Sequence, residues 1–287
     1  MRAIVTGGVG FVGTNLIKRL IKDKDTVVSL DNYSTGKKEN EQKGCRYEWC
    51  DLADTVDFSL FMKDIDVIFH LAALARIQPS LKDPTKYLAN NLNGTLNILE
   101  FARKENIKVV YAGSSSMHHG LYGSPYAWSK YGGEELCRLY SSVYDLNTAV
   151  CRFYNVYGPH HLREGAYATV IGIFEELYRN NSPLTITSDG EQRRDFTHVD
   201  DIVDGLIRCS EQNFKAEEFE FGRGVNHSIN ELADMFGENY PRNYLPKRLG
   251  EYDTTLCTDK KAEEILGWKP TKNLKEYIIQ FKESWKK

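Results

Sequence analysis

The stretch that decides the fold is RAIVTGGVGFVGTNLIKRLIK, residues 2–22. Its first five residues form a short, largely apolar run that is typical of a buried strand. A glycine-rich turn follows at once, and the remainder spaces its apolar residues along one face of a helix. The order strand, glycine turn, helix predicts the first unit of a doubly wound α/β fold.

The turn contains two overlapping glycine patterns. Gly7, Gly10 and Gly13 form G-x-x-G-x-x-G, while Gly8 with Gly10 and Gly13 forms G-x-G-x-x-G. Such glycines let the backbone turn tightly, approach a pyrophosphate and pack the helix on the sheet. The helix N-terminus adds free N–H groups and partial positive charge. A dinucleotide-binding loop is therefore predicted; the alternative is a glycine-rich turn without a ligand.

An acidic residue follows at the spacing that such a site requires. Asp31 ends the next apolar run, 18 residues after Gly13. A carboxylate there accepts both ribose hydroxyls of an adenosine and repels a 2′-phosphate. The pattern predicts NAD rather than NADP, although Lys37 and Lys38 lie nearby and weaken that choice.

The alternation of strands and helices continues through the first half of the chain. Strands are expected at 26–31, 46–49, 66–72, 108–113 and 148–153, with helices at 84–104 and 125–144. This order predicts a parallel sheet covered by helices on both faces. After about residue 155, turn-rich segments separate helical patterns at 167–179, 199–210, 228–237 and 273–285. We expect a Rossmann domain over 1–155 and a smaller α/β substrate lobe, mainly 156–287, without a sharp boundary.

Composition narrows the possible partners. The 287 residues are 41% hydrophobic and 27% charged, with a formal net charge of −3 and no long basic run. These values argue against nucleic acid or an anionic membrane as the main partner. No stretch of about twenty apolar residues occurs, the N-terminus lacks a signal-peptide pattern, and the six cysteines show no metal-like spacing. We therefore expect a cytoplasmic protein with reduced thiols and no metal site.

Further motifs follow the glycine loop in a fixed order. They are HLAA (70–73), Tyr126-x-x-x-Lys130, RFYNVYGP (152–159), RRDFTHVDD (193–201) and RLGEYDTT (248–255). With these motifs the chain resembles the extended short-chain dehydrogenase/reductases over essentially its whole length. Within them it is most similar to nucleotide-sugar 4-epimerases of the UDP-galactose and UDP-N-acetylglucosamine type. The resemblance implies epimerisation at C4 of a UDP-hexose or UDP-N-acetylhexosamine by transient oxidation to a 4-keto sugar.

The resemblance also implies which residues contact each ligand. Together with the loop glycines Gly7, Gly10 and Gly13, the NAD contacts are Phe11, Val12, Asp31, Asn32, Ser34, Gly36, Asp51, Leu52, Leu71, Ala72, Ala73, Asn91, Tyr126, Lys130 and Tyr154. The UDP-sugar contacts are Ser115, Asn155, Arg194, Arg248 and Glu251.

The catalytic candidates lie in AGSSSMHHGLYGSPYAWSK, residues 112–130. Tyr126 and Lys130 fall in a helical pattern, where residues i and i+4 share one face. Tyr33 and Lys37 match the same spacing but flank a loop. A nearby ammonium, with the positive nicotinamide ring, favours phenolate over phenol, so Tyr126 is expected to act as a base.

The three serines follow an expected strand, at the sheet edge where doubly wound folds bind ligands. Counting back from Gly120, Ser115 takes the position of the family's catalytic Ser/Thr, where it would hydrogen-bond the reacting oxygen. Ser114 or Ser116 takes that role if the alignment is shifted by one residue. At least one of the three serines is expected to cap the following turn.

Two further features of this stretch bear on the pocket. The pairs His118–His119 and His160–His161 favour structural or substrate-rim roles over catalysis. Relatives carry a much longer loop before the tyrosine helix, whereas only LYGS (121–124) separates Gly120 from it here. Either the sugar pocket is more open, or another segment covers it.

Several alternatives remain open. A 4,6-dehydratase needs extra acid/base groups, which that branch supplies as Thr-Asp-Glu; here the run is Ser115-Ser116-Met117. A decarboxylase, a reductase, an epimerase acting at another carbon and a catalytically silent NAD-binding regulator are the others. Alignment with relatives puts Thr255 where small size would admit an N-acetyl group.

Relatives commonly dimerise through a four-helix bundle of the segments 84–104 and 125–144. A homodimer of that kind would use Leu88, Leu92, Leu96, Leu136 and Leu139, which are equally suited to an ordinary core.

Overall fold

A computed structural model of the chain describes residues 1–54, 57–61 and 63–285. Its centre is a seven-stranded parallel sheet in the order β11-β6-β5-β4-β1-β2-β3. The strands are β1 (Arg2–Thr6), β2 (Thr26–Asp31), β3 (Cys45–Trp49), β4 (Val67–His70), β5 (Lys108–Ser114), β6 (Thr148–Phe153) and β11 (Lys215–Phe221). The strand order reverses between β1 and β4, which is where doubly wound folds bind ligands.

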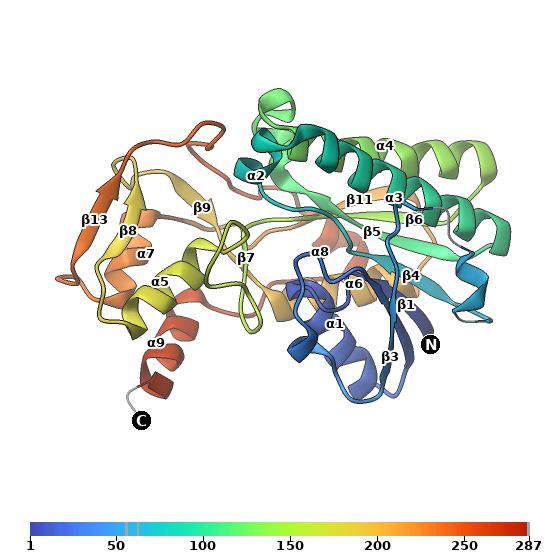
Figure 1. Cartoon of the computed structure of the whole chain (residues 1–287), viewed down its shortest axis with the longest axis horizontal. Coiled ribbons are helices and arrows are strands. Elements are labelled where there is room, and N and C mark those ends of the chain that lie inside the picture. Colours follow the sequence, from blue (N-terminus) through green and yellow to red (C-terminus); the bar gives the residue numbers. More distant parts are fainter. Residues whose placement is uncertain (55–56, 62, 286–287) are drawn as a thin grey trace.

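Helices cover both faces of the sheet (Figure 1). One face carries α1 (Phe11–Lys22), α6 (Val199–Glu211) and α8 (Lys261–Leu266), and the other carries α3 (Pro84–Glu105) and α4 (Pro125–Tyr144). Residues along β1 alternate between these layers: Ala3 and Val5 pack with α1 and α6, while Ile4 packs on the α3 side. The predicted Rossmann fold is confirmed.

Local sequence sets the starts of the two long helices. α4 begins where the Ser124 side chain accepts a hydrogen bond from the Ala127 N–H at 3.1 Å, with Pro125 in the first helical position. Asp83 caps α3 in the same way, ahead of Pro84. Proline in the first turn removes no helical hydrogen bond. A separate short helix, α2 (Ile77–Lys82), precedes α3.

A smaller lobe with its own core lies beside the sheet (Figure 1). Its helices are α5 (Val170–Arg179), α7 (Ile229–Phe236) and α9 (Leu274–Trp285), and its main strands are β8 (Leu184–Thr187) and β13 (Arg242–Leu245). The remaining strands form short pairs, β7 (Val156–Tyr157) with β10 (Thr197–His198) and β9 (Arg193–Asp195) with β12 (Asn226–Ser228). The 3-10 turns are Lys38–Asn40, Phe58–Leu60, Ser115–His119 and Leu121–Gly123.

The chain passes between sheet and lobe more than once after residue 155. α6 and β11 return to the sheet, where β11 pairs in parallel with β6 at the edge. The sequence of β11, KAEEFEF, was not predicted as a strand, because its charged residues are typical of an exposed edge. The division of function at residue 155 therefore stays a prediction.

None of the helices formed by the described residues is long and apolar enough to cross a membrane.

One buried carboxylate ties the C-terminal segment to the sheet layer. Asp201, in the first turn of α6, is 4% exposed. Its carboxylate accepts hydrogen bonds from the backbone N–H groups of Thr271 and Lys272, both at 3.0 Å, and from the Thr271 hydroxyl at 2.9 Å. Its backbone carbonyl accepts from Trp268 Nε1 at 2.8 Å. Asp201 is thus a main anchor of the segment that leads into α9.

We predict that Asp201→Ala lowers the free energy of unfolding by about 3 kcal/mol, because it leaves three donors without their charged acceptor. Chemical denaturation would measure the change. Asp204→Ala is the matched control, because it removes a partly exposed pair with Arg208 and costs about 1 kcal/mol or less. Equal losses in the two variants would contradict this role of Asp201.

Candidate active site

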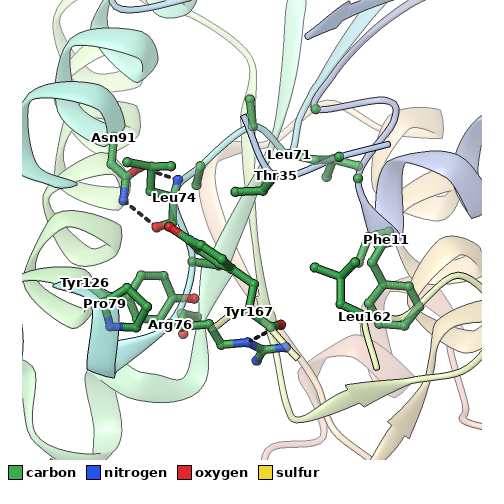
Figure 2. Close-up of a pocket in the computed structure, with 18 of the residues that line it drawn as sticks. Phe11, Thr35, Leu71, Leu74, Arg76, Pro79, Asn91, Tyr126, Leu162 and Tyr167 are labelled. Atoms are coloured by element: carbon green, nitrogen blue, oxygen red, sulfur yellow. Dashed lines mark hydrogen bonds between the residues drawn. The ribbon is translucent and has the colours of Figure 1, made fainter. Parts of the chain in front are cut away.

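A cavity of about 940 Å³ opens at the carboxyl edge of the sheet, facing the lobe (Figure 2). The glycine loop and the segments after β2, β4 and β5 form one side. The first turn of α4 and several lobe residues form the other. The volume is at the upper end for a small-molecule site, about 300–1,000 Å³.

Both glycine patterns have a structural reason. A Cβ on Gly13 would lie 2.2 Å from the carbonyl oxygen of Gly7, whose φ is +72°. A Cβ on Gly8 would lie 2.1 Å from Ser29 Oγ in β2, so Gly8 serves packing while Gly7, Gly10 and Gly13 line the cavity. Gly10 caps α1 without a side chain. The first N–H groups of α1 are therefore directed toward the cavity, as anion binding requires.

Asp31 is fixed against this loop. Its carboxylate accepts from the Val9 N–H at 3.1 Å and the Tyr33 N–H at 2.8 Å. Burial raises the pKa of Asp31, and these two hydrogen bonds oppose the rise. Next to it, Asn32 Nδ2 donates to Asp51 Oδ2 at 2.9 Å. This end of the cavity therefore presents acceptors, which suit ribose hydroxyls.

The hydroxyl groups of Ser114, Ser115 and Ser116 differ in their hydrogen-bond partners. Ser116 Oγ donates to Ser114 Oγ at 2.8 Å, and the Ser116 N–H donates to the same atom at 3.2 Å. No hydrogen bond joins Ser115 Oγ to another of the described residues, although Ser115 is only 8% exposed and lines the cavity. Ser115 is thus the hydroxyl left for a ligand.

Tyr126 and Lys130 lie one turn apart on α4 but in different surroundings. Tyr126 lines the cavity (Figure 2). Lys130 is 4% exposed and lies behind the wall, with its Nζ 4.3 Å from the ring centroid of Tyr111. Burial lowers the pKa of Lys130 to about 8, and the carboxylate of Glu134 opposes that shift.

The opposite end of the cavity carries guanidinium groups. Arg194 and Arg248 line it together with Glu251 and Asn155. Burial lowers the pKa of Arg194, while nearby Glu251 acts to raise it. The Asn155 amide donates to the Asp195 carbonyl at 3.0 Å and to Thr255 Oγ1 at 2.9 Å, so its oxygen is what remains for a ligand.

The structure brings together nearly all the residues that the sequence singled out. Every predicted cofactor or substrate contact lines this cavity except Lys130 and Tyr154, and His160 lines it as well. Tyr154 is 3% exposed, buried next to the wall residues Phe153 and Asn155.

The other histidines have structural contacts. His118 Nε2 lies 2.6 Å from Glu220 Oε1, and His161 Nε2 lies 3.0 Å from Glu175 Oε2. Burial lowers the pKa of His70, at the end of β4, to about 3. The side chain of His119 lies outside what the structure describes. Among the described residues, no group of three or more His, Cys, Asp or Glu side chains is placed to hold a metal ion.

The short LYGS connection is accompanied by a covering segment, residues 247–252. Gln78 Nε2 donates to the Leu249 carbonyl at 2.6 Å. A Cβ on Gly120 would lie 3.4 Å from the Tyr252 ring, and one on Gly250 would lie 3.5 Å from the Gly123 carbonyl. Residues 247–252 therefore pack against the short connection, and a cover of the sugar pocket by this segment stays a prediction.

The sequence reasoning missed Arg76 and Tyr167, which project into the same space (Figure 2). Arg76 Nε donates to the Tyr167 carbonyl at 3.1 Å, and the Tyr87 hydroxyl donates to the Tyr167 hydroxyl at 3.0 Å. An arginine six residues after the end of β4, at the carboxyl edge of the sheet, was the available signal.

Comparison with known proteins gives the family of this chain. The family model described as "NAD dependent epimerase/dehydratase family" matches residues 3–222. The chain belongs to this family. It is therefore an NAD-dependent enzyme of the epimerase and dehydratase class, and the expected extended short-chain dehydrogenase/reductase relationship is confirmed.

Relatives match over almost their whole length. A UDP-glucose 4-epimerase of Mycolicibacterium smegmatis is 33% identical and is covered to 97%, with 98% of this chain aligned. Two solved structures align over 100% of this chain at 28% identity each. They are a UDP-glucose 4-epimerase of Thermotoga maritima with UDP-glucose (TM-score 0.91, 100% covered) and a UDP-glucuronic acid 4-epimerase of Bacillus cereus with UDP-glucuronic acid and NAD (TM-score 0.89, 99% covered).

The residues present fit the family's cofactor. At Gly7 and Gly13 of the loop, neighbouring backbone atoms occupy the space that a Cβ would need. The first turn of α1 has no side-chain cap. Both features suit a bound pyrophosphate. Asp31 presents its carboxylate at the adenosine end, while Lys37 lies at the surface 4.0 Å from Glu39 and off the cavity wall. That arrangement suits NAD rather than its 2′-phosphorylated form.

We predict a pH signature for the buried ammonium of Lys130. Its pKa is lowered to about 8 in the folded chain, so between about pH 8 and 10.5 the unfolded chain binds more protons and stability rises with pH. Relative to Lys130→Met, wild-type stability should therefore rise by about 3 kcal/mol across that window. Denaturation at a series of pH values measures the difference, and a flat difference would contradict the burial of a charged Lys130.

Proposed function

We propose that the protein is a 4-epimerase of a UDP-hexose or UDP-N-acetylhexosamine. One observation carries the proposal: Ser115 and Tyr126 face the same cavity as the glycine loop on one side and Arg194 and Arg248 on the other. A sugar anchored by its diphosphate at the arginines would extend its ring toward Tyr126.

Each protein group has a defined task in this reaction. NAD⁺, held by the glycine loop and Asp31, would supply a reversible hydride acceptor for C4. Tyr126 removes the proton of the 4-hydroxyl as the C4–H bond breaks and gives it back afterwards. Ser115 Oγ, which has no partner among the described residues, hydrogen-bonds the same oxygen. Lys130, one turn further along α4, is held against the ring of Tyr111.

The nucleotide must stay anchored while the 4-keto sugar turns over. Guanidinium groups hold diphosphate oxygens through paired hydrogen bonds, which suits Arg194 and Arg248. Glu251 and the free Asn155 oxygen are acceptors, so they suit hydroxyl groups of ribose or sugar rather than phosphate. Thr255 is 3% exposed and its hydroxyl accepts from Asn155 Nδ2, so admission of an N-acetyl group beside it stays a prediction.

The geometry favours epimerisation over two of the open alternatives, dehydration and a silent regulator. Dehydration needs an acid beside the reacting carbon, yet the carboxylates that line the described cavity are Asp31 and Asp51 at the adenosine end and Glu251 at the arginine end. A silent NAD-binding regulator has no use for a cavity-facing Tyr126 or for a free serine hydroxyl next to it.

We predict that Tyr126→Phe lowers kcat by about 10²–10⁴-fold with little change in KM, because it removes proton transfer and leaves binding intact. Chromatographic separation of epimers after incubation with UDP-glucose, UDP-N-acetylglucosamine or UDP-glucuronate measures turnover. Tyr122→Phe, which alters a tyrosine 87% exposed, is the control. Wild-type turnover by Tyr126→Phe would refute the mechanism, and no turnover of any of these sugars would refute the substrate class.

We further propose that two copies pair through α3 and α4. Leu96 and Leu139 on these helices are 41% and 51% exposed, and Leu88, Leu92 and Leu136 are half-buried. A four-helix bundle with a second copy would remove this apolar surface from water.

The double variant Leu96→Glu/Leu139→Glu is expected to shift the protein from dimer to monomer, because it places charges at the centre of the contact. Light scattering at a fixed concentration measures the mass. Val225→Glu, at a position 52% exposed in the lobe, is the control. A wild-type monomer, or a double variant that remains dimeric, would contradict the pairing.

A further inference from the structure

Arg76 has a strained backbone at the edge of the cavity. It lies between β4 and α2 with φ +94° and ψ 136°, a conformation that favours glycine. Such strain persists where the surrounding structure imposes it, and it is concentrated at functional sites. Here the Tyr167 carbonyl holds the side chain through Nε, which leaves the outer nitrogens of the guanidinium without a partner among the described residues.

Arg76 has no counter-ion within the part of the chain that the structure describes. No Asp or Glu of the described residues forms an ion pair with it, and the groups that act to raise its pKa are the phenols of Tyr126 and Tyr87. Burial acts the other way and lowers the pKa of Arg76. Arg76 is half-buried. A cation partly removed from water without a counter-ion is costly, and a ligand that brings a negative charge offsets that cost. Arg194, by contrast, has Glu251 and Asp253 nearby.

Arg76 lies where a sugar ring would lie. It lines the main cavity with Tyr126, and it also lines an adjoining cavity of about 230 Å³ with Arg194 and Arg248. In Figure 2, Arg76 is at the Tyr126 end, and Phe11 of the glycine loop is across the cavity. The position is therefore between the proposed site of C4 oxidation and the proposed diphosphate anchor.

We propose that Arg76 recognises a carboxylate carried by the sugar itself, so that the preferred substrate is a UDP-hexuronate. This inference rests on the proposed function and narrows its UDP-hexose to the C6 acid. C6 is attached to C5, next to the reacting C4, so its carboxylate lies on the part of the ring closest to Tyr126. A guanidinium holds a carboxylate through two parallel hydrogen bonds, while a neutral hydroxymethyl group leaves the cation uncompensated.

Binding to the Tyr126→Phe variant tests this without turnover. Calorimetric titration with UDP, UDP-glucose and UDP-glucuronate, in the presence of NAD, gives three dissociation constants. We expect UDP-glucuronate to bind about 10–100-fold more tightly than UDP-glucose, the range of one charged hydrogen-bonded contact. Equal affinities, or tighter binding of UDP-glucose, would overturn the proposal even if the protein folds and epimerises a neutral sugar.

A second variant assigns the preference to Arg76. Adding Arg76→Gln should weaken UDP-glucuronate binding by about 10-fold or more and change UDP and UDP-glucose by less than about threefold. Arg76→Lys should keep part of the preference, because it retains charge without the planar fork. Arg138→Gln, at an exposed arginine of α4, is the control.

The remaining outcomes are distinguishable. Weaker binding of UDP itself in Arg76→Gln would assign Arg76 to the diphosphate and overturn the proposal. If the Arg76→Gln protein does not melt cooperatively, its binding data are set aside. The affinities of the Tyr126→Phe protein for UDP-glucuronate and UDP-glucose then decide the question. Failure of the 4-epimerase proposal shows elsewhere, as absence of product from every UDP-sugar with the wild-type chain.

Discussion

The approach of Gly13 to Gly7 is the contact on which the rest of the site depends. A side chain at residue 13 would place its Cβ 2.2 Å from the Gly7 carbonyl oxygen, so β1 can turn into α1 this tightly only with glycine there. The same turn brings the Val9 N–H to the Asp31 carboxylate at 3.1 Å. The loop, the helix start and the acidic end of β2 are thereby fixed as one rigid body, which is what dinucleotide recognition requires.

Elsewhere on the cavity wall, polar groups are left without protein partners. Ser114 and Ser116 bond each other, and the Ser115 hydroxyl stays available. The cations Arg76 and Arg194 are half-buried, and the loss of hydration that lowers the pKa of each is a cost that an anionic ligand would offset. These groups lower the stability of the unliganded protein, and a charged substrate would restore that stability on binding. Such a compromise between stability and function is common.

The sequence predicted those elements whose bounds are set by interactions between residues close together in the chain. The bounds of α1 and α4 were predicted at both ends, because a glycine loop and a Ser-Pro start act within a few residues. The edge strand β11 was missed because its charges belong to the sheet border rather than to a buried strand. Arg76 was missed because its orientation depends on a backbone φ of +94° and on the Tyr167 carbonyl, 91 residues further along the chain.

The measurement that tests the account most directly follows a C4 hydrogen through the reaction. The wild-type protein would be incubated in ordinary water with UDP-glucuronate or UDP-glucose carrying deuterium at C4, and the epimer examined by mass spectrometry and NMR. In the proposed reaction C4 would lose a hydride to bound cofactor and regain the same hydride, so deuterium is predicted to stay at C4 of the product. Exchange of that deuterium for solvent hydrogen would contradict it, since the inversion would then proceed by proton abstraction at carbon.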